Sequence, residues 1–304
     1  MNETDTLSPE SSPLRIANFR AYFVSRLTMT LAQYAMMLII GWQTYNIARD
    51  SGLGVAEASG QLALIGLLQF VPLFLLTPFS GWAADHFDRR NVARLTMLAQ
   101  LGCAATLTWF TWSETLTITA LFGVAIVLGI VRAFNGPALS ALAPNLVPKT
   151  ILPNAIALSS IAWQTGMIVG PAIGGYTHAI YPALPYTFAC VLFGVAITAL
   201  SFIGKVPQPP REANKRPIHQ MVEGLRYVVR NKMVLGAITL DLFAVFLAGA
   251  TALFPVFARD ILQVGETGLA QLAMAPAVGA ALTALWFSFR PLKTNVGPRM
   301  LWAV

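Results

Sequence analysis

Eight long apolar runs dominate this sequence and leave it few ways to fold. A helix that crosses a membrane needs about 20 mostly apolar residues, and continuous runs do not have the alternating pattern of a β-barrel. A ninth run begins near Met300 and stops at Val304. We therefore predict an all-α, polytopic transmembrane helical bundle with about eight complete spans and the start of a ninth. The eight runs cover approximately 21–48, 59–80, 91–112, 117–143, 153–179, 184–204, 234–257 and 267–288.

The composition supports a membrane protein. Of the 304 residues, 56% are hydrophobic and only 11% are charged, and the mean hydropathy is +0.64. A soluble fold would need an implausibly large apolar core to bury so much apolar surface. Cys103 and Cys190 lie singly inside apolar runs, which favours buried small hydrophobes over a disulfide or a metal site.

The distribution of lysine and arginine predicts the orientation. If the N-terminus is cytoplasmic, 17 of the 20 basic residues fall in cytoplasmic segments, Arg49 and Arg259 fall outside, and Arg132 lies within an apolar run. Cytoplasmic loops retain positive charge, so we predict a bacterial-type inner-membrane protein with its N-terminus inside. The pI of about 9.7 then reflects topology, and no nucleic-acid partner is needed to explain it.

The chain divides into four predicted segments. Residues 1–20 are a polar tail that we expect to be disordered, 21–204 form a six-span bundle, and 234–304 form an incomplete second bundle. Residues 205–233 are a cytoplasmic linker whose apolar residues after Pro217 recur at helical spacing. Two interpretations of this linker helix stay open, an amphipathic helix on the inner leaflet and a surface helix packed on the bundle.

A short repeat relates the two bundles. The first run ends in "YNIARDSGLG" and the seventh in "PVFARDILQVG", so Ala-Arg-Asp recurs at 48–50 and 258–260 on the same side of the membrane. Parallel repeats of six spans are a transporter architecture. On this plan the second bundle is unfinished, and a truncated protein that does not transport is one alternative.

Charge is concentrated in "SGWAADHFDRRNV", residues 80–92, between the second and third runs. Gly81 allows close approach of a neighbouring helix. Asp85 is expected to accept hydrogen bonds from the amides that begin the next helix and to pair with Arg89 or Arg90. The alternatives are a loop that only sets topology and, for His86, an ordinary solvated histidine.

This stretch resembles the signature of the major facilitator superfamily, carried here by Gly81, Asp85, Arg89 and Arg90. The segments "VRAFNGPALSALAPNLVP", "GMIVGPAIGG" and "DLFAVFLAGATALFPVFARD" extend the resemblance along the chain. They look most like the drug:proton antiporter branch, which includes enterobactin exporters, macrolide efflux proteins and a lysophospholipid transporter. The resemblance implies that the stretch, with Asp88, forms a latch that holds the inner side closed in the outward-facing state.

The fifth run carries a stripe of small residues. Glycines one helical turn apart give a smooth face for close helix packing, and a proline inside a helix favours a kink. The resemblance implies that this pattern marks antiporters, and ordinary packing is the alternative. The residues are Gly166, Gly170, Pro171, Gly174 and Gly175.

Two ionisable residues lie within apolar runs, where charge is costly and usually functional. Arg132 and Asp241 both fall in the predicted inner half of the membrane. The resemblance implies that the fourth and seventh spans both line a central cavity, so a pairing of the two across the bundles is geometrically reasonable. Our hypothesis is that Asp241 is the proton-coupling carboxyl and that Arg132 tunes its pKa. The alternatives are a static buried ion pair and an Asp241 side chain that reaches the interface.

Polar and aromatic groups within the runs are candidates for a substrate cavity. Packing or anchoring at the membrane interface is the alternative for each of them. They are Gln33, Tyr34, Asn135, Trp163 and Gln164.

These features predict a secondary transporter that exports a small amphiphilic molecule, such as a siderophore or drug, using a proton gradient. A lysophospholipid flippase is the second transporter interpretation. The sequence has no phosphate-binding Gly-Lys-Ser/Thr loop, paired-histidine metal motif or Gly-x-Ser-x-Gly elbow, so we expect no enzyme activity, cofactor or metal. The expected partners are a small-molecule substrate and the lipid bilayer.

Overall fold

The computed structural model describes residues 12–204, 224 and 226–289. All regular secondary structure within this part of the chain is helical. The first half contains α1 Ala17–Asp50, α2 Val55–His86, α3 Arg89–Trp112, α4 Ile118–Leu142, α5 Leu152–Ile180 and α6 Leu184–Ser201. The second half contains α8 Lys232–Leu247, α9 Phe254–Val256 and α10 Gly265–Phe289.

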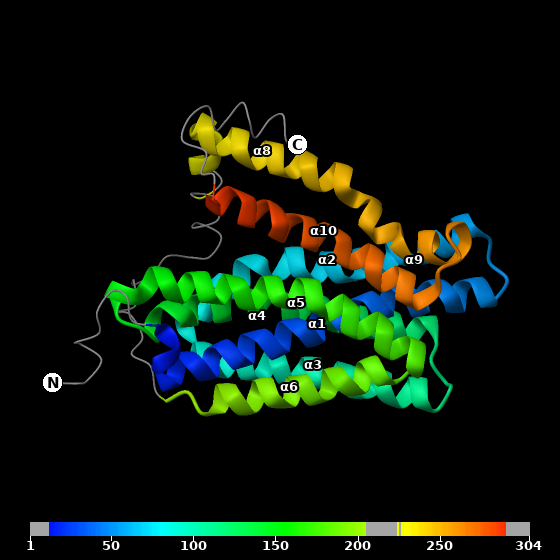
Figure 1. The fold of residues 1–304 in the computed structure, drawn as a ribbon, viewed down its shortest axis with the longest axis horizontal. Coiled ribbons are helices and arrows are strands. Elements are labelled where there is room, and N and C mark those ends of the chain that lie inside the picture. Colours follow the sequence, from blue (N-terminus) through cyan, green and yellow to red (C-terminus); the bar gives the residue numbers. More distant parts are fainter. Residues whose placement is uncertain (1–11, 205–223, 225, 290–304) are drawn as a thin grey trace.

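The six helices of the first half run side by side in alternating directions and form one bundle (Figure 1). α1 packs against α5 and α6, α2 packs against α4, and α3 packs against α4 and α6. We call the two ends of the bundle the Asp50 end, where α1 ends, and the Asp88 end, where α2 is followed by α3. Because the helices alternate, α5 also ends at the Asp50 end, and α4 and α6 end at the Asp88 end.

The core of the first half is formed mainly by α1, α3, α4 and α6, with Ile65 of α2 and Ala155 of α5 also buried in it. Close packing of buried side chains is a main source of helix association in a membrane, because the lipid is as apolar as the protein interior. The largest fully buried side chains in this core include Phe19, Tyr22, Met36, Ile39, Met97, Leu107, Leu121, Leu139, Tyr186 and Phe193. Phe19 also shows that helical packing starts before residue 20, where the sequence predicts the end of a disordered tail; α1 begins at Ala17.

Five of the described helices are long and apolar enough to cross a membrane, namely α1, α2, α4, α5 and α6. The third predicted run is also a helix, but α3 begins with Arg89 and Arg90 and carries Arg94 in its second turn, which lowers its apolar character. The predicted ninth run lies outside the described residues, as does most of the linker helix. The count of eight spans and part of a ninth therefore stays a prediction.

The seventh predicted run, 234–257, is not one continuous helix. α8 ends at Leu247 and is followed by 3-10 turns over Ala248–Leu253, the short α9, and a π-helical turn over Phe257–Ile261. Pro255 cannot donate a backbone hydrogen bond, and short 3-10 and π segments are common where a helix is interrupted. The interruption places 251–260 against the end of α1.

α10 lies along the first half, and α8 lies on the side of α10 that faces away from the first half (Figure 1). α10 packs mainly against α5, whereas α8 packs mainly against the 3-10 turns that follow it. Among the described residues, contact between the two halves is therefore made by α5 and α10 and by the segment around α9.

The glycines of α5 produce the close packing that their spacing predicts. A β-carbon added to Gly170 would lie 2.7 Å from Cβ of Tyr34, and one added to Gly174 would lie 2.7 Å from the Ala35 carbonyl oxygen. Gly166 meets Thr30 in the same way. These three glycines face α1, so the stripe brings two helices of the first half together.

Gly175 faces in a different direction. An added β-carbon would lie 2.5 Å from Cβ of Ala270 and 2.7 Å from the Glu266 carbonyl oxygen, both on α10. Neighbouring glycines on α5 thus serve two contacts, one within the first half and one between the halves.

Candidate functional site

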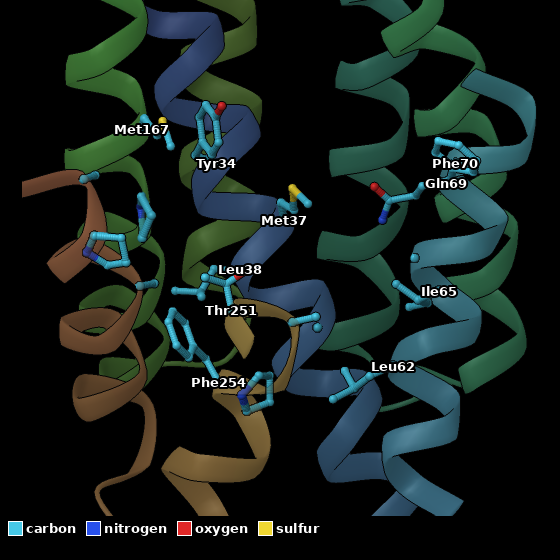
Figure 2. A pocket seen from close by; sticks show the side chains of 18 of the residues that line it. Tyr34, Met37, Leu38, Leu62, Ile65, Gln69, Phe70, Met167, Thr251 and Phe254 are labelled. Carbon is cyan, nitrogen blue, oxygen red and sulfur yellow. The ribbon is translucent and has the colours of Figure 1, made fainter. Parts of the chain in front are cut away.

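A cavity of about 580 Å³ lies between the two halves. α1, α2, α4 and α5 contribute its lining from the first half, and residues 251–255 and α10 contribute from the second. Figure 2 shows Met37 on α1 and Gln69 on α2 pointing toward one another, while Phe254 and Thr251 lie nearer the Asp50 end. A site of this size, shared by two halves, is suited to a small organic molecule.

The lining is mostly apolar. Polar atoms come from Tyr34, Gln69, Thr251 and Arg132, and the last is the one charged side chain among the residues that line the cavity. The apolar wall consists of leucine, isoleucine, methionine, phenylalanine, proline, glycine and alanine. An apolar wall with a few placed polar groups is the usual chemistry of a ligand pocket.

One of the five residues predicted to line a substrate cavity does line this cavity. Tyr34 lines the cavity, whereas Gln33, Asn135, Trp163 and Gln164 are not among its lining residues. Asn135 is buried between helices, where its amide oxygen accepts a hydrogen bond from Thr96 (3.2 Å) and its amide nitrogen contacts the Met29 sulfur (2.9 Å). A polar residue in an apolar helix can be satisfied by a neighbouring helix, so its presence in the sequence does not identify a cavity.

The pairing of Arg132 with Asp241 is not formed in the described structure. Both side chains are described, and no ion pair joins them in the described part of the chain. Nη1 of Arg132 lies 3.9 Å from the Met37 sulfur, and Asp241 is exposed on α8. The physical reason is that α10 and the turns around α9, rather than α8, lie against the first half.

At the Asp50 end the two Ala-Arg-Asp repeats bind each other. Arg49 Nη2 lies 3.0 Å from Oδ1 of Asp260, and Arg259 Nη2 lies 2.6 Å from Oδ1 of Asp50. Each repeat therefore supplies an arginine to the aspartate of the other. We call these two ion pairs the reciprocal clamp.

Further hydrogen bonds hold the clamp. Arg259 Nη1 donates to the carbonyl oxygen of Asn46 (3.1 Å), and the Tyr45 hydroxyl donates to Oδ2 of Asp260. The Tyr45 hydrogen bond is the main cause, and Arg49 a further cause, of a pKa of Asp260 below the usual aspartate value. Asp260 is therefore ionised at neutral pH.

Apolar contacts between the halves lie beside the clamp. Trp42 of α1 packs with Ala258 and Leu269, and Tyr45 packs in a second cluster with Leu62 and Val256. These contacts lie between the cavity and the ion pairs, because Leu62 also lines the cavity. Charged and apolar contacts together join the two halves at the Asp50 end.

A histidine and a glutamate add a third polar contact between the halves. His178 near the end of α5 is buried, and its Nδ1 lies 3.5 Å from Oε1 of Glu266 on α10. Neither ring nitrogen has a hydrogen-bond partner within the described structure. Nearby, the Gln271 amide nitrogen lies 3.5 Å from the Tyr176 hydroxyl.

At the Asp88 end the charged residues bind within the first half. Asp88 caps α3 by accepting a hydrogen bond from the Arg90 amide (3.0 Å), and its Oδ2 lies 2.6 Å from Arg90 Nη2. The side-chain hydrogen bond from Arg90 is the main cause of a pKa of Asp88 below the usual value. The sequence predicts this capping role for Asp85, but the structure gives it to Asp88, because α2 continues to His86.

Three arginines at this end donate to backbone carbonyls at helix ends. Arg89 Nη1 binds the Ala141 oxygen (2.9 Å), Arg90 Nη1 the Ile203 oxygen (3.0 Å) and Arg94 Nη2 the Leu200 oxygen (3.2 Å). The last carbonyls of a helix lack intrahelical partners and carry partial negative charge. These arginines therefore tie α3 to the ends of α4 and α6.

The remaining residues of the predicted latch are only partly described. The side chains of Asp85 and His86 lie outside the described residues. No described atom lies within 4 Å of a β-carbon added at Gly81, so the close helix approach predicted there is not seen. Among the described side chains of the predicted latch, Asp88, Arg89 and Arg90 make the contacts given above, and those contacts join helices of one half.

Sequence alone did not predict that the two Ala-Arg-Asp repeats bind each other across the two halves. It identified them as a repeat and as the basic residues outside the cytoplasmic set, but not as partners. Two features could have predicted this pairing. Each repeat carries both an arginine and an aspartate, and both repeats are predicted on the same side of the membrane. Four further residues of the site were not predicted, because a single residue inside or beside an apolar run belongs to no spacing pattern that would identify it. They are His178, Glu266, Gln69 and Met37.

Known proteins resemble this chain in sequence and in fold. The sequence profile of the family described as transmembrane secretion effector matches residues 8–299. The staphyloferrin A transporter of Staphylococcus aureus is 26% identical over 230 residues, which are 74% of this chain and 57% of the relative. The multidrug efflux pump Tap of Mycobacterium tuberculosis is also 26% identical over 230 residues, 72% of this chain and 55% of the relative. The chain thus spans a little over half the length of these two relatives.

The fold agrees with these matches. The crystal structure of a bacterial homologue of the human lysosomal transporter Spinster, in an inward-facing and unoccupied conformation, superposes with a TM-score of 0.61. The sequence identity is 17%, and the match covers 90% of this chain and 63% of the other. The profile match, the helical bundle and this likeness together show that the chain belongs to the transmembrane secretion effector family of the major facilitator superfamily.

Proposed function

We propose that this protein is a secondary active transporter that exports a small amphiphilic molecule, such as a siderophore or drug, in exchange for protons. The observation that carries the proposal is the cavity lined by both halves of the chain. Alternating access needs a binding site between two units that move against each other. The relatives named for siderophore transport and multidrug efflux agree with this substrate class.

The orientation follows from the basic residues. We place the Asp88 end in the cytoplasm, because most lysines and arginines lie in the segments on that side. The reciprocal clamp then lies on the outer side, where it closes the cavity, and the structure corresponds to an inward-facing state. When the outer side opens, the clamp separates and the latch residues at the Asp88 end hold the inner side closed.

Asp241 is the proposed proton-coupling carboxyl. It lies in α8 within an otherwise apolar stretch, KMVLGAITLDLFAVFL, and an ionisable group in such a stretch is costly unless it has a function. No arginine partner holds it in this conformation within the described residues. A carboxyl without a fixed counter-ion is free to take up and release a proton as the helices around it change.

The test is transport in reconstituted vesicles with an imposed pH gradient. The probes are ethidium, erythromycin, staphyloferrin A and lysophosphatidylcholine, each measured with and without a proton uncoupler. We expect the protein to accumulate at least one of the first three, and the uncoupler to abolish accumulation. Asp241→Asn should lose this proton-driven transport, while the matched variant Glu114→Gln, on the connection after α3, should retain it.

Three outcomes would contradict the proposal. Transport that is unaffected by the uncoupler would exclude proton exchange. Movement of lysophosphatidylcholine alone would replace the exporter with a lipid transporter, and wild-type rates in Asp241→Asn would remove that residue from the mechanism.

A further inference from the structure

Among the described residues that line the cavity, the arginine at position 132 is the only one with a charged side chain. Its Nη1 lies 3.9 Å from the Met37 sulfur, and it interacts electrostatically with Tyr34 on the same wall of the cavity. The sequence predicts that Asp241 neutralises it, and the structure shows that this pair is not formed. The guanidinium therefore faces the cavity with a full positive charge and no counter-ion from the described residues.

The described carboxylates lie elsewhere. None of them lines the cavity. Asp50 and Asp260 bind arginines in the reciprocal clamp, Glu266 lies beside His178, and Asp88 binds Arg90. The others are Glu57, which accepts a hydrogen bond from the Gly54 amide (2.9 Å), Glu114 on the connection after α3, and Asp241 on α8.

The charge of this arginine is permanent and its surroundings make it costly. Arginine does not lose its proton in proteins, and a cation surrounded by apolar groups carries an unfavourable desolvation energy unless an anion or hydrogen-bond acceptor offsets it. The planar guanidinium also matches the two oxygens of a carboxylate better than a lysine ammonium does. The missing partner is therefore best supplied by an anionic ligand.

The rest of the cavity indicates what else the ligand carries. Tyr34 and Gln69 offer hydrogen-bonding groups, and Phe70, Met167 and Phe254 provide apolar surface. Figure 2 shows Gln69 directed into the space between α1 and α2. A ligand that satisfies all of these groups has one anionic end and an apolar body.

We propose that Arg132 anchors the anionic group of the ligand, and that the cavity selects amphiphilic organic carboxylates over neutral or cationic molecules of the same shape. Binding follows from the cavity alone, whereas the transport of such molecules rests on the proposed function. The proposal makes Arg132 a binding residue that determines specificity.

A matched pair of probes tests the proposal. The purified chain is placed in nanodiscs of neutral phosphatidylcholine, and binding of 1-naphthaleneacetate and 1-naphthaleneacetamide is measured by calorimetry against empty nanodiscs. A hydrogen bond to a charged group contributes about 1.5–3 kcal/mol. We therefore expect the acid to bind about 10- to 100-fold more tightly than the amide.

Variants locate the preference. Arg132→Gln should bring the acid-to-amide affinity ratio close to 1 while the amide still binds, which shows that the cavity is intact. Arg132→Lys should retain part of the preference, because it keeps the charge but loses the two-pronged geometry. The control Arg226→Gln, at an exposed position that does not line the cavity, should leave the ratio unchanged.

The proposal is overturned if the wild-type protein binds the acid and the amide equally, a result that needs no variant. It is also overturned if Arg132→Gln keeps the preference. Vesicle transport separates this proposal from the function. A preference for the acid without any transport contradicts the exporter, whereas transport by a protein that binds both probes equally contradicts the anchor.

Discussion

The Asp50 end and the Asp88 end of the bundle both concentrate arginine and aspartate, yet they use them differently. At the Asp50 end, Arg49 and Arg259 each bind the aspartate of the other half. At the Asp88 end, Asp88 binds Arg90, and the arginines donate to carbonyls at the ends of α4 and α6. The first set joins two halves, and the second joins helices of one half.

The difference shows that charge alone does not identify a gate. Ion pairs that join two separate units resist their separation, whereas ion pairs within one unit stabilise it whether or not it moves. We infer that the Asp50 end carries the contacts that must break when this conformation changes. On the same inference, the described Asp88 contacts stabilise the first half itself.

Reversing one charge of the clamp is expected to have the largest effect. Arg49→Asp places a carboxylate beside Asp260, so an attraction becomes a repulsion. Spin labels at Val55→Cys and Leu262→Cys, two exposed positions in different halves at this end, should report a larger population of long distances. The labels are introduced in a background with Cys103→Ala and Cys190→Ala.

The control for this prediction restores the opposite charges in exchanged positions. Arg49→Asp combined with Asp260→Arg should return the distances toward those of the parent. If the single reversal leaves the distance distribution unchanged, the clamp does not hold the halves together.

Substitutions of two neighbouring glycines on α5 should have an intermediate effect. They should distinguish contact between the two halves from packing within the first half. An added methyl group in a tightly packed site costs about 1–3 kcal/mol. Gly175→Ala would press against Ala270 of the second half, and Gly174→Ala would press against Ala35 of the first. We expect Gly175→Ala to lengthen the label distance and Gly174→Ala to lower the unfolding temperature of the bundle.

The glycine pair is its own matched control, since the two changes add the same group one residue apart. Both are followed by the label distance and by thermal unfolding in detergent. Identical responses of the two variants in both measurements would show that the halves do not behave as separate units.

The smallest expected effect is that of pH. The pKa of Asp260 and the pKa of Asp88 both lie below the usual aspartate value, which is about 3.9. A lowered folded pKa gives stabilisation that is complete above the unfolded pKa and is lost as pH falls through the folded pKa. The label distance should therefore be constant from pH 8 to pH 5 and should increase only below about pH 4.

The pH series is measured in a His178→Gln variant, because His178 and Glu266 form another titratable contact at the same end. A change between pH 8 and pH 5 in this variant would contradict the assignment of a permanently ionised clamp. A change that appears only with His178 present would assign the response to the histidine.

The parts of the fold that sequence predicted best depend on local spacing. The glycines of α5 were expected to give close packing, and Gly166, Gly170 and Gly174 do meet α1. Residues four apart lie on one face of any helix, so this face exists whatever lies opposite. The sequence did not indicate that Gly175 belongs to a different contact, because that depends on where α10 lies.

The residues of the site were harder to predict. Asp88 rather than Asp85 caps α3, since the end of α2 is set by only two or three residues, and helix ends are the least certain part of any sequence prediction. Arg132 stands out in the sequence as a charge within an apolar run, but the partner expected for it, Asp241, does not bind it in the described structure. Partner choice depends on the relative positions of α4 and α8, which no spacing within either helix records.

Sequence alone indicates a helical membrane protein and predicts two related parts, because the length of apolar runs, the bias of basic residues and a repeated Ala-Arg-Asp can all be read along one chain. The packing of the helices was needed to show that the two repeats bind each other, that no described carboxylate lines the cavity beside Arg132, and that the described contacts of Asp88 lie within the first half. The physical reason is that ion pairs and cavities form between elements far apart in sequence, so they depend on how whole helices pack.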